Sequence, residues 1–296
     1  MTTAFPVEQG GSAAAIRHHY DVGNDFYAAW LDPTMAYSCA MWEGVPDDAS
    51  LEEAQHRKLR YHAASIGAGP GMRVLDVGCG WGAQMRTLIE TFGVAACVGL
   101  TLSDEQAAHV RSLAMPDVSV AVTNWHDYRP QVPFDGIVSV GAFEHFAHPD
   151  QSPDERRAVY RRFFTSCHDW TGGRGRLSLQ TIAYGTMEPG QANPFITGDI
   201  FPAAELPTLE DIVVASKGLF RIVRLRDDAP DYARTCEAWA QRLRRAEAAG
   251  EAGADSALIE RYYRYLRLSA AGFAMRRIVL LRLRLDPIGK PSRRAG

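Results

Sequence analysis

The sequence predicts an α/β fold with a mostly parallel central sheet and helices on both faces of that sheet. Short apolar segments typical of buried strands alternate along the chain with longer segments that have helical spacing. A glycine-rich turn directly follows the first of these strands, and α/β sheets bind ligands at the carboxyl ends of their strands. The 296 residues, 46% of them hydrophobic, are enough for one such domain with elaborations.

The alternation is preceded by a helix that we expect to begin at Ser50. Ser50 and Glu53 have the spacing of a capping box, and the helical pattern continues to about Ala64. The apolar segments predict strands at residues 73–77, 95–100, 118–122, 136–140, 176–182 and 278–285. The helical patterns cover residues 83–92, 103–113, 231–249 and 256–271. We therefore expect a single domain over residues 16–288.

Three segments lie outside this alternation. Residues 1–15 are rich in small residues and are expected to be disordered, and residues 289–296 form a basic tail. Residues 16–37 are rich in aromatic side chains broken by turn signals, which predicts a helical N-terminal segment. Residues 184–207 interleave prolines and glycines with aromatics, and we expect them, with residues 231–271, to cover the substrate.

Composition excludes several classes of protein. A net charge of -3 argues against a nucleic-acid partner, and no apolar stretch is long enough to span a membrane. The five cysteines form no CxxC pair, so we expect no metal site and a cytoplasmic location. The basic C-terminus is either a solvated end or a site of peripheral lipid contact. The oligomeric state stays open.

The glycine-rich turn has the pattern Asp-x-Gly-x-Gly-x-Gly, with Asp76, Gly78 and Gly80 at its start. Glycines allow the backbone to turn tightly and to approach a ligand closely, so a Cβ at Gly78 is expected to clash with that ligand. The leading acid would repel a pyrophosphate, unlike the first positions of dinucleotide-binding turns. The ammonium and sulfonium of S-adenosylmethionine suit an acidic turn of this kind. The pattern therefore favours S-adenosylmethionine as the cofactor.

Polar and aromatic residues follow the next two strands. Thr101 and Leu102, with Gln106, stand where ribose hydroxyls would fall, although many methyltransferases place an acid there. Trp125 follows the third strand and can stack on an adenine face, or else belong to the edge of the core.

Several ordered motifs resemble the cyclopropane-fatty-acid synthase family, and most nearly the mycolic-acid cyclopropane synthases and their methyltransferase relatives. The similarity spans roughly residues 18–285. The matching segments are residues 37–40, 50–55, 74–82, 99–103, 141–146, 200–202, 206–207, 231–235 and 272–273.

The resemblance implies a Rossmann-like class I methyltransferase fold and two sets of site residues. The cofactor would contact Tyr37, Ser38, Gly78, Thr101, Gln106 and Trp125. A bicarbonate ion would be held by Cys39, Glu144, Gln180 and Tyr232. Gln180 departs from the family, whose mycolate enzymes carry histidine there, so either the anion is held differently or Glu144 is itself the base.

The implied chemistry suits these residue types. Methyl transfer to an alkene carbon leaves a carbocation, from which a base must remove a proton. Glu144 can act as that base in a dry pocket, which would also raise its pKa, and Tyr232 can stabilise the cation. His145 is either a second proton carrier or a structural histidine. Cys39 is expected to act through its backbone amide.

Three functions are compatible with the sequence. The first is C-methylation of an alkene in an apolar lipid-like or isoprenoid small molecule, giving a methylated alkene or a cyclopropane. The second is N-methylation of a small amine, because plant alkaloid N-methyltransferases share the fold and the Glu-His pair. The third is a non-catalytic cofactor-binding scaffold, which the intact Glu144 and glycine turn disfavour.

Overall fold

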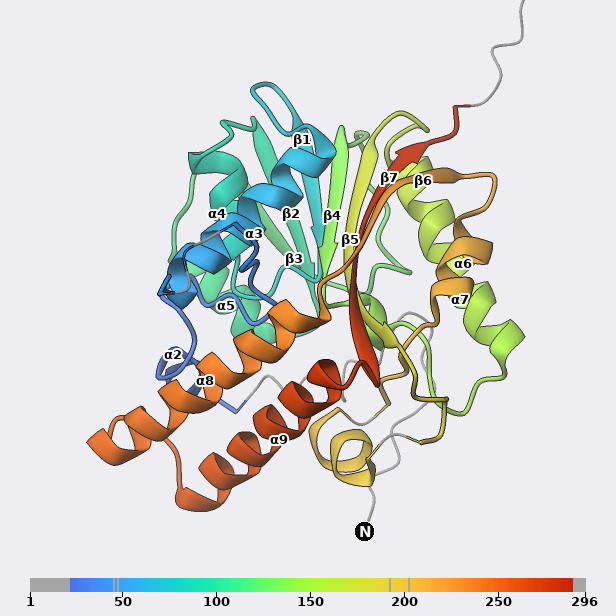
Figure 1. The fold of residues 1–296 in the computed structure, drawn as a ribbon. Coiled ribbons are helices and arrows are strands. Elements are labelled where there is room, and N and C mark those ends of the chain that lie inside the picture. Colours follow the sequence, from blue (N-terminus) through green and yellow to red (C-terminus); the bar gives the residue numbers. More distant parts are fainter. Residues whose placement is uncertain (1–21, 45, 47, 192, 202, 290–296) are drawn as a thin grey trace, which may run out of the picture.

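The computed structural model describes residues 22–289 except positions 45, 47, 192 and 202 (Figure 1). The N-terminal segment expected to be disordered and most of the basic tail lie outside these residues. Among the described residues, no helix combines the length and the apolar character needed to cross a bilayer.

A seven-stranded sheet forms the centre of the molecule, in the order β3-β2-β1-β4-β5-β7-β6. The pairs among β3, β2, β1, β4 and β5 are parallel, whereas β7 runs antiparallel to both β5 and β6. The strands are β1 (Arg73–Val77), β2 (Ala96–Thr101), β3 (Val118–Val122), β4 (Gly136–Val140), β5 (Arg176–Tyr184), β6 (Phe220–Asp227) and β7 (Ile278–Pro287). The predicted mostly parallel sheet is confirmed.

The sequence pattern did not predict β6. It is an edge strand in which Phe220 is the sole buried residue, so it needs no regular run of apolar residues. Its arginines hide the strand pattern, and its pairing with β7 depends on a partner about sixty residues away.

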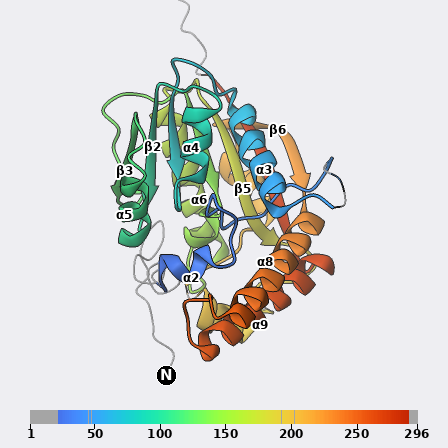
Figure 2. The same ribbon diagram turned by 90° about the vertical axis from the view of Figure 1, so that its left-hand side faces the viewer.

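Helices cover both faces of the sheet (Figures 1 and 2). One face packs against α3 (Leu51–Ile66), α4 (Ala83–Glu90) and α5 (Asp104–Ser112). The other packs against α6 (Pro153–Trp170) and α7 (Leu209–Ser216). The predicted capping box of α3 is present, since the amide of Glu53 donates to the Ser50 hydroxyl and the Glu53 carboxylate accepts from the Ser50 amide.

A third layer lies beyond the carboxyl ends of the parallel strands, at the bottom of Figure 1. It consists of α2 (Asn24–Ala28), α8 (Ala229–Ala249), α9 (Ser256–Ala274) and the π-helical turn Ile196–Ile200. Aromatic side chains of α2 pack against α9; for example, the rings of Phe26 and Tyr262 are 4.9 Å apart. This layer closes the edge of the sheet at which ligands bind in α/β folds.

The arginine-rich face of α6 attaches α7 to the rest of the molecule. Arg157 pairs with Asp211 at 2.7 Å, and Arg161 donates to the carbonyl of Ala215 at 3.0 Å. Arg156 pairs with Glu205, just before α7, at 3.3 Å. These guanidinium groups therefore serve packing between elements.

Candidate active site

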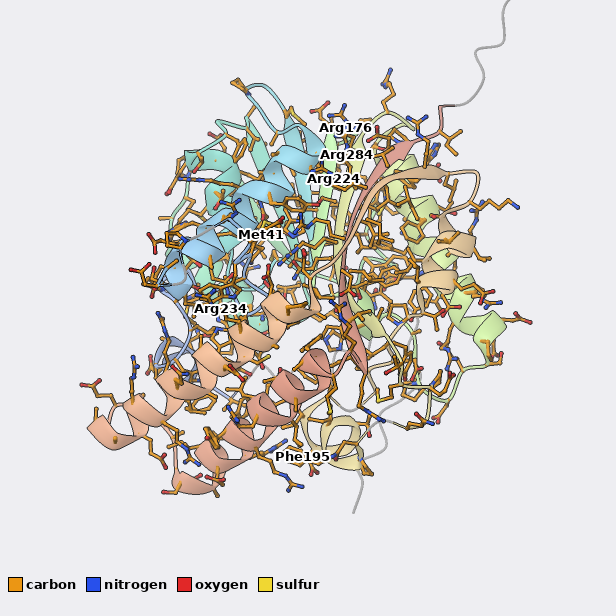
Figure 3. The ribbon with its side chains drawn as sticks, viewed as in Figure 1. Met41, Arg176, Phe195, Arg224, Arg234 and Arg284 are labelled. Atoms are coloured by element: carbon orange, nitrogen blue, oxygen red, sulfur yellow. The ribbon has the colours of Figure 1, made fainter. Side chains whose placement is uncertain are left out.

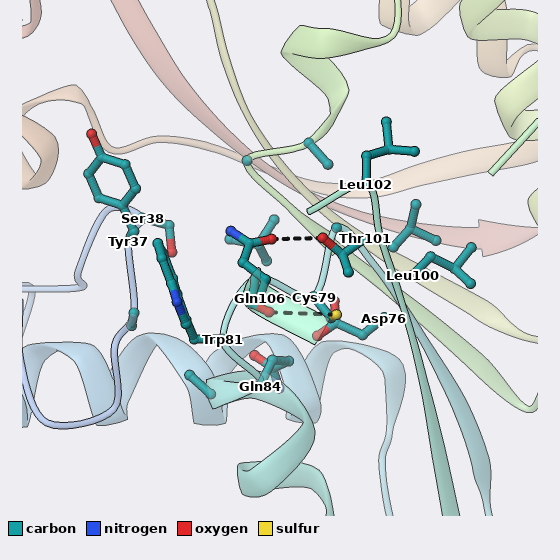
Figure 4. Close-up of a pocket in the computed structure, with 18 of the residues that line it drawn as sticks. Tyr37, Ser38, Asp76, Cys79, Trp81, Gln84, Leu100, Thr101, Leu102 and Gln106 are labelled. Carbon is teal, nitrogen blue, oxygen red and sulfur yellow. Dashed lines mark hydrogen bonds between the residues drawn. The ribbon is translucent and has the colours of Figure 1, made fainter. Parts of the chain in front are cut away.

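Two adjoining cavities lie at the carboxyl edge of the parallel strands, and the first is built around the glycine turn (Figure 4). All nine residues predicted to contact the cofactor line it. They are Tyr37, Ser38, Asp76, Gly78, Gly80, Thr101, Leu102, Gln106 and Trp125. Residues from four separate parts of the chain thus meet at one site.

The turn after β1 takes a path that favours glycine. Gly78 has φ +82° and Gly80 has φ +52°, both in the left-handed region. The Gly78 amide donates to the carbonyl of Leu100 at 2.9 Å, which ties the turn to the end of β2. A Cβ on Gly78 would lie 2.4 Å from Cβ of Ala142. A glycine is therefore needed here because the loop containing Ala142 packs closely against the turn, whether or not a ligand is bound. Gly80 has open space at that position, which leaves room for a ligand along the turn.

Asp76 lines this cavity and has a carboxylate oxygen without a partner in the described part of the chain. The residue is 2% exposed, and its Oδ2 has no hydrogen-bond partner among the described residues. Burial raises the pKa of Asp76 to about 7. A cationic ligand group would supply the missing partner.

The end of β2 supplies polar groups that hold one another in place. The hydroxyl of Thr101 donates to Oε1 of Gln106 at 2.7 Å and accepts from the Ser103 amide at 3.1 Å (Figure 4). Trp125 lines the same cavity while its ring packs 5.1 Å from Phe146. Its two proposed roles, ligand contact and core packing, are therefore compatible.

Lys58 and Gln84 are among the lining side chains that sequence reasoning did not assign to this cavity. Trp81 lies inside the glycine motif, and its indole N–H donates to Asn24 at 2.7 Å, which ties α2 to the turn. The helical pattern of α3 shows which positions are buried, and such positions are usually apolar. A buried lysine among them is a signal that could have been found.

The second cavity, of about 820 Å³, lies under the third layer and is lined mainly by apolar side chains. Tyr37, Gly141 and His145 line both cavities, so the two cavities adjoin. Of the predicted catalytic residues, Glu144, His145 and Tyr232 line the second cavity. Residues from the predicted cover, including Tyr184, Ile196 and Leu206, form part of its wall.

Glu144 lies in a single 3₁₀ turn, Phe143–His145, directly after β4. Its Oε1 accepts a hydrogen bond of 2.6 Å from the amide of Ile182, whereas its Oε2 is buried without a partner among the described residues. Burial raises the pKa of Glu144 to about 7, although the Ile182 amide and the nearby Thr181 hydroxyl oppose the shift. The group can therefore exchange a proton near neutral pH.

The other two predicted catalytic residues that line this cavity, His145 and Tyr232, are poorer bases. Burial lowers the pKa of His145 to about 4, so the imidazole is neutral near pH 7. Tyr232 on α8 stacks on Phe273 with the ring centroids 4.3 Å apart, and burial raises the pKa of its hydroxyl. Tyr232 offers an aromatic face and an un-ionised hydroxyl.

Cys39 and Gln180 are not among the residues that line either cavity. Oε1 of Gln180 accepts from Arg282 at 2.8 Å and contacts the His62 ring at 3.1 Å. Arg282, on β7, is fully buried, pairs with Asp228, and donates to the carbonyl of Cys39 at 3.0 Å. Burial raises the pKa of the Cys39 thiol to about 12, which leaves no thiolate to act as a nucleophile.

The fold and the first cavity define the class of protein, which is a class I S-adenosylmethionine-dependent methyltransferase. The solved structure of the cyclopropane synthase MmaA2 from Mycobacterium tuberculosis is similar, with a TM-score of 0.82, 34% identity, and 96% of this chain and 99% of that chain covered. The mycolic acid cyclopropane synthase CmaA1, solved with SAH and CTAB, matches with a TM-score of 0.81 and 33% identity over 93% and 98% of the two chains.

Sequence comparison identifies the family. The family model described as mycolic acid cyclopropane synthetase matches residues 8–283. The curated cyclopropane mycolic acid synthase MmaA2 of Mycobacterium tuberculosis (strain ATCC 25177 / H37Ra) is 38% identical over 269 residues, which cover 85% of this chain and 89% of that protein. The chain belongs to the mycolic acid cyclopropane synthetase family.

This membership confirms that the protein is an enzyme and that its cofactor is S-adenosylmethionine. The cavity fits this cofactor, because the unpaired Asp76 oxygen suits an ammonium and the space beside Gly80 admits a ligand. The alternative of an amine N-methyltransferase is not favoured.

Proposed function

We propose that the protein methylates an alkene carbon of an apolar, lipid-like molecule, with S-adenosylmethionine in the first cavity and the alkene in the second. A lipid-like substrate is supported by the names of the relatives, which are cyclopropane mycolic acid synthases, and by the detergent CTAB in the CmaA1 structure. Isoprenoid alkenes are also apolar and carry a carbon–carbon double bond, so an isoprenoid is the second substrate to test.

The observation that carries the proposal is the unpaired, buried oxygen of Glu144 beside a cavity of about 820 Å³. Ligand pockets are usually about 300–1,000 Å³ and largely apolar, so this one can enclose an extended hydrocarbon segment. The shared residues Tyr37, Gly141 and His145 place its inner end next to the cofactor cavity.

When bound, S-adenosylmethionine would supply an electrophilic methyl group to the alkene, and S-adenosylhomocysteine would be the leaving group. The second alkene carbon then becomes cationic, and the side chains around it determine the product. The faces of Tyr232 and Phe273 stabilise the positive charge, and the apolar wall excludes water that would trap it. Glu144 accepts the proton: loss from a neighbouring carbon gives a methylated alkene, and loss from the new methyl group closes a cyclopropane.

We propose one domain for residues 16–288, with residues 184–207 and 231–271 as its substrate cover. Within the described part of that range, one continuous sheet links the elements before and after the cover. Arg264 of α9 stacks on the ring of Phe195 at 4.3 Å, which holds the first part of the cover, residues 184–207, against the second (Figure 3).

A bicarbonate ion remains a candidate ligand beside Glu144 and Tyr232, but Gln180 would not help to hold it. Glu144 and Tyr232 share a cavity, whereas the side chain of Gln180 hydrogen bonds with His62 and Arg282. If an anion assists, Gln180→His should make the rate more sensitive to added bicarbonate than it is in the wild type.

The experiment that tests the function offers the enzyme alkenyl lipids and isoprenoids with methyl-labelled S-adenosylmethionine. Labelled product carrying one additional carbon is expected, and NMR then distinguishes a methyl branch from a cyclopropane. Label transfer to amines and to no alkene would contradict the proposal.

A further inference from the structure

Lys58 is a buried cation in the wall of the cofactor cavity. It lies on α3 and is 2% exposed, yet it is not part of the glycine turn or of any strand end. A lysine this deeply buried is uncommon unless its charge has a partner.

The partners found in the protein are incomplete. Nζ donates to the hydroxyl of Ser38 at 2.9 Å, and among the described residues it forms no ion pair with a carboxylate. Asp32 is close enough to affect its pKa, but that carboxylate accepts from the amide and hydroxyl of Thr34 at 3.1 and 2.7 Å. The ammonium therefore keeps donor capacity that a ligand oxygen can use.

Asp76 lines the same cavity and carries the opposite charge when ionised. It also lacks a full set of partners, since its Oδ2 has no hydrogen-bond partner among the described residues. Lys58 and Asp76 are close enough to affect each other's pKa, but they form no ion pair. A buried cation and a buried anion that each lack a full partner are complementary to a ligand that carries both charges.

The methionyl end of S-adenosylmethionine is a zwitterion with an α-carboxylate and an α-ammonium. We infer that Lys58, with the hydroxyl of Ser38, binds the α-carboxylate of the cofactor, while Asp76 binds its α-ammonium. Lys58 thereby positions the methionyl chain and sets the direction in which the methyl group points. This inference rests on the placement of the cofactor in the first cavity proposed above.

The test compares ligands that differ only in the methionyl end. S-Adenosylhomocysteine carries both charges, its decarboxylated analogue lacks the carboxylate, and 5′-methylthioadenosine lacks the whole amino-acid part. Calorimetry is run on the wild type, on Lys58→Met, and on Lys217→Met, which removes an exposed lysine far along the chain.

We expect Lys58→Met to weaken S-adenosylhomocysteine binding by about 10- to 100-fold, the size of a lost hydrogen bond to a charged group. Binding of the decarboxylated analogue and of 5′-methylthioadenosine should change less than about threefold, and Lys217→Met should change none of them. An equal loss for all three ligands would show that Lys58 only shapes the cavity and would overturn the inference. Unchanged binding of S-adenosylhomocysteine would overturn it as well. Failure of the wild type to bind S-adenosylhomocysteine would instead contradict the cofactor site itself.

Discussion

Two buried carboxyl groups, Asp76 and Glu144, line the two adjoining cavities, and each has one oxygen without a partner among the described residues. Burial raises the pKa of each to about 7, so near neutral pH both can change charge as ligands arrive. Their surroundings differ, because Asp76 feels the positive charge of Lys58 whereas Glu144 faces a mainly apolar cavity. The first suits binding a cation, and the second suits accepting a proton.

Glu144→Gln should retain cofactor affinity and lose most turnover, because the amide keeps the shape of the carboxyl group without its basicity. A positioned general base contributes about 10²–10⁴-fold, so we expect a loss of that size in kcat. Glu205→Gln is the matched control, since Glu205 lines the same cavity but pairs with Arg156 and Tyr184. Wild-type turnover in Glu144→Gln would show that Glu144 is structural.

The pH dependence of the rate should follow the same group. Because the base must be deprotonated, kcat/KM is expected to rise with pH and level off above about 7, the pKa of Glu144. The contribution of Glu144 to the free energy of unfolding should instead decrease as the pH rises. Folding raises this pKa from 4.5 to about 7, so the folded protein holds a proton that the unfolded chain releases in that window.

The wild type should therefore lose free energy of unfolding relative to Glu144→Gln as the pH rises from 4.5 to about 7. Denaturant titrations of both proteins across this range measure the difference. A constant difference would show that burial does not raise the pKa of Glu144.

At the scale of elements, β7 connects the predicted sheet to the N-terminal loop. Arg282 on β7 contacts Gln180 on β5, Asp228 before α8, and the carbonyls of Cys39 and Ala40. The loop that it holds continues directly from Tyr37 and Ser38, which line the cofactor cavity. One buried cation thus joins three parts of the chain beside the site.

Arg282→Met should destabilise the protein by about 3–5 kcal/mol, the usual cost of removing one partner from a buried ion pair. Arg284→Met is the matched control on the same strand. Arg284, which Figure 3 labels, lies two residues further along β7, is partly exposed and pairs with Asp286 at 3.1 Å, so a change within about 1 kcal/mol is expected. Urea unfolding measures both, and equal losses would contradict the role given to Arg282.

At the scale of the whole molecule, the third layer turns an open sheet edge into an enclosed cavity. Residues 184–207 of the cover contribute Tyr184, Ile196 and Leu206, and its second part, on α8 and α9, contributes Tyr232 and Tyr265. A substrate in this cavity would contact both parts of the cover. Ligand binding is therefore expected to stabilise segments that are far apart in sequence.

Hydrogen exchange should show residues 184–207 protected when cofactor and substrate are both bound, and less so with cofactor alone. The reason is that the second cavity, and not the first, is walled by this segment. The strand amides of β1 and β4 serve as an internal control with little change. If hydrogen exchange in residues 184–207 were the same with and without substrate, these residues would not form a substrate cover.

Local signals in the sequence determined the parallel sheet, the capped α3 helix and the first cavity. Strand and helix periodicity are local, and the ends of neighbouring parallel strands necessarily meet at one edge, so Asp76, Gly78, Thr101 and Trp125 could be assigned to one site without coordinates. Their proximity follows from topology alone.

Only the tertiary structure decided which polar groups are left without partners. Contacts between residues that are distant in sequence leave Glu144 Oε2 and Asp76 Oδ2 without partners among the described residues. Such contacts also give Gln180 its hydrogen bond from Arg282. The same holds for Lys58, whose position on α3 indicates that it is buried but not which cavity it lines, and for β6, which pairs at the sheet edge without an apolar pattern. Burial and charge pairing are properties of the packed chain, because a desolvated charge is stable only beside the groups that folding brings to it.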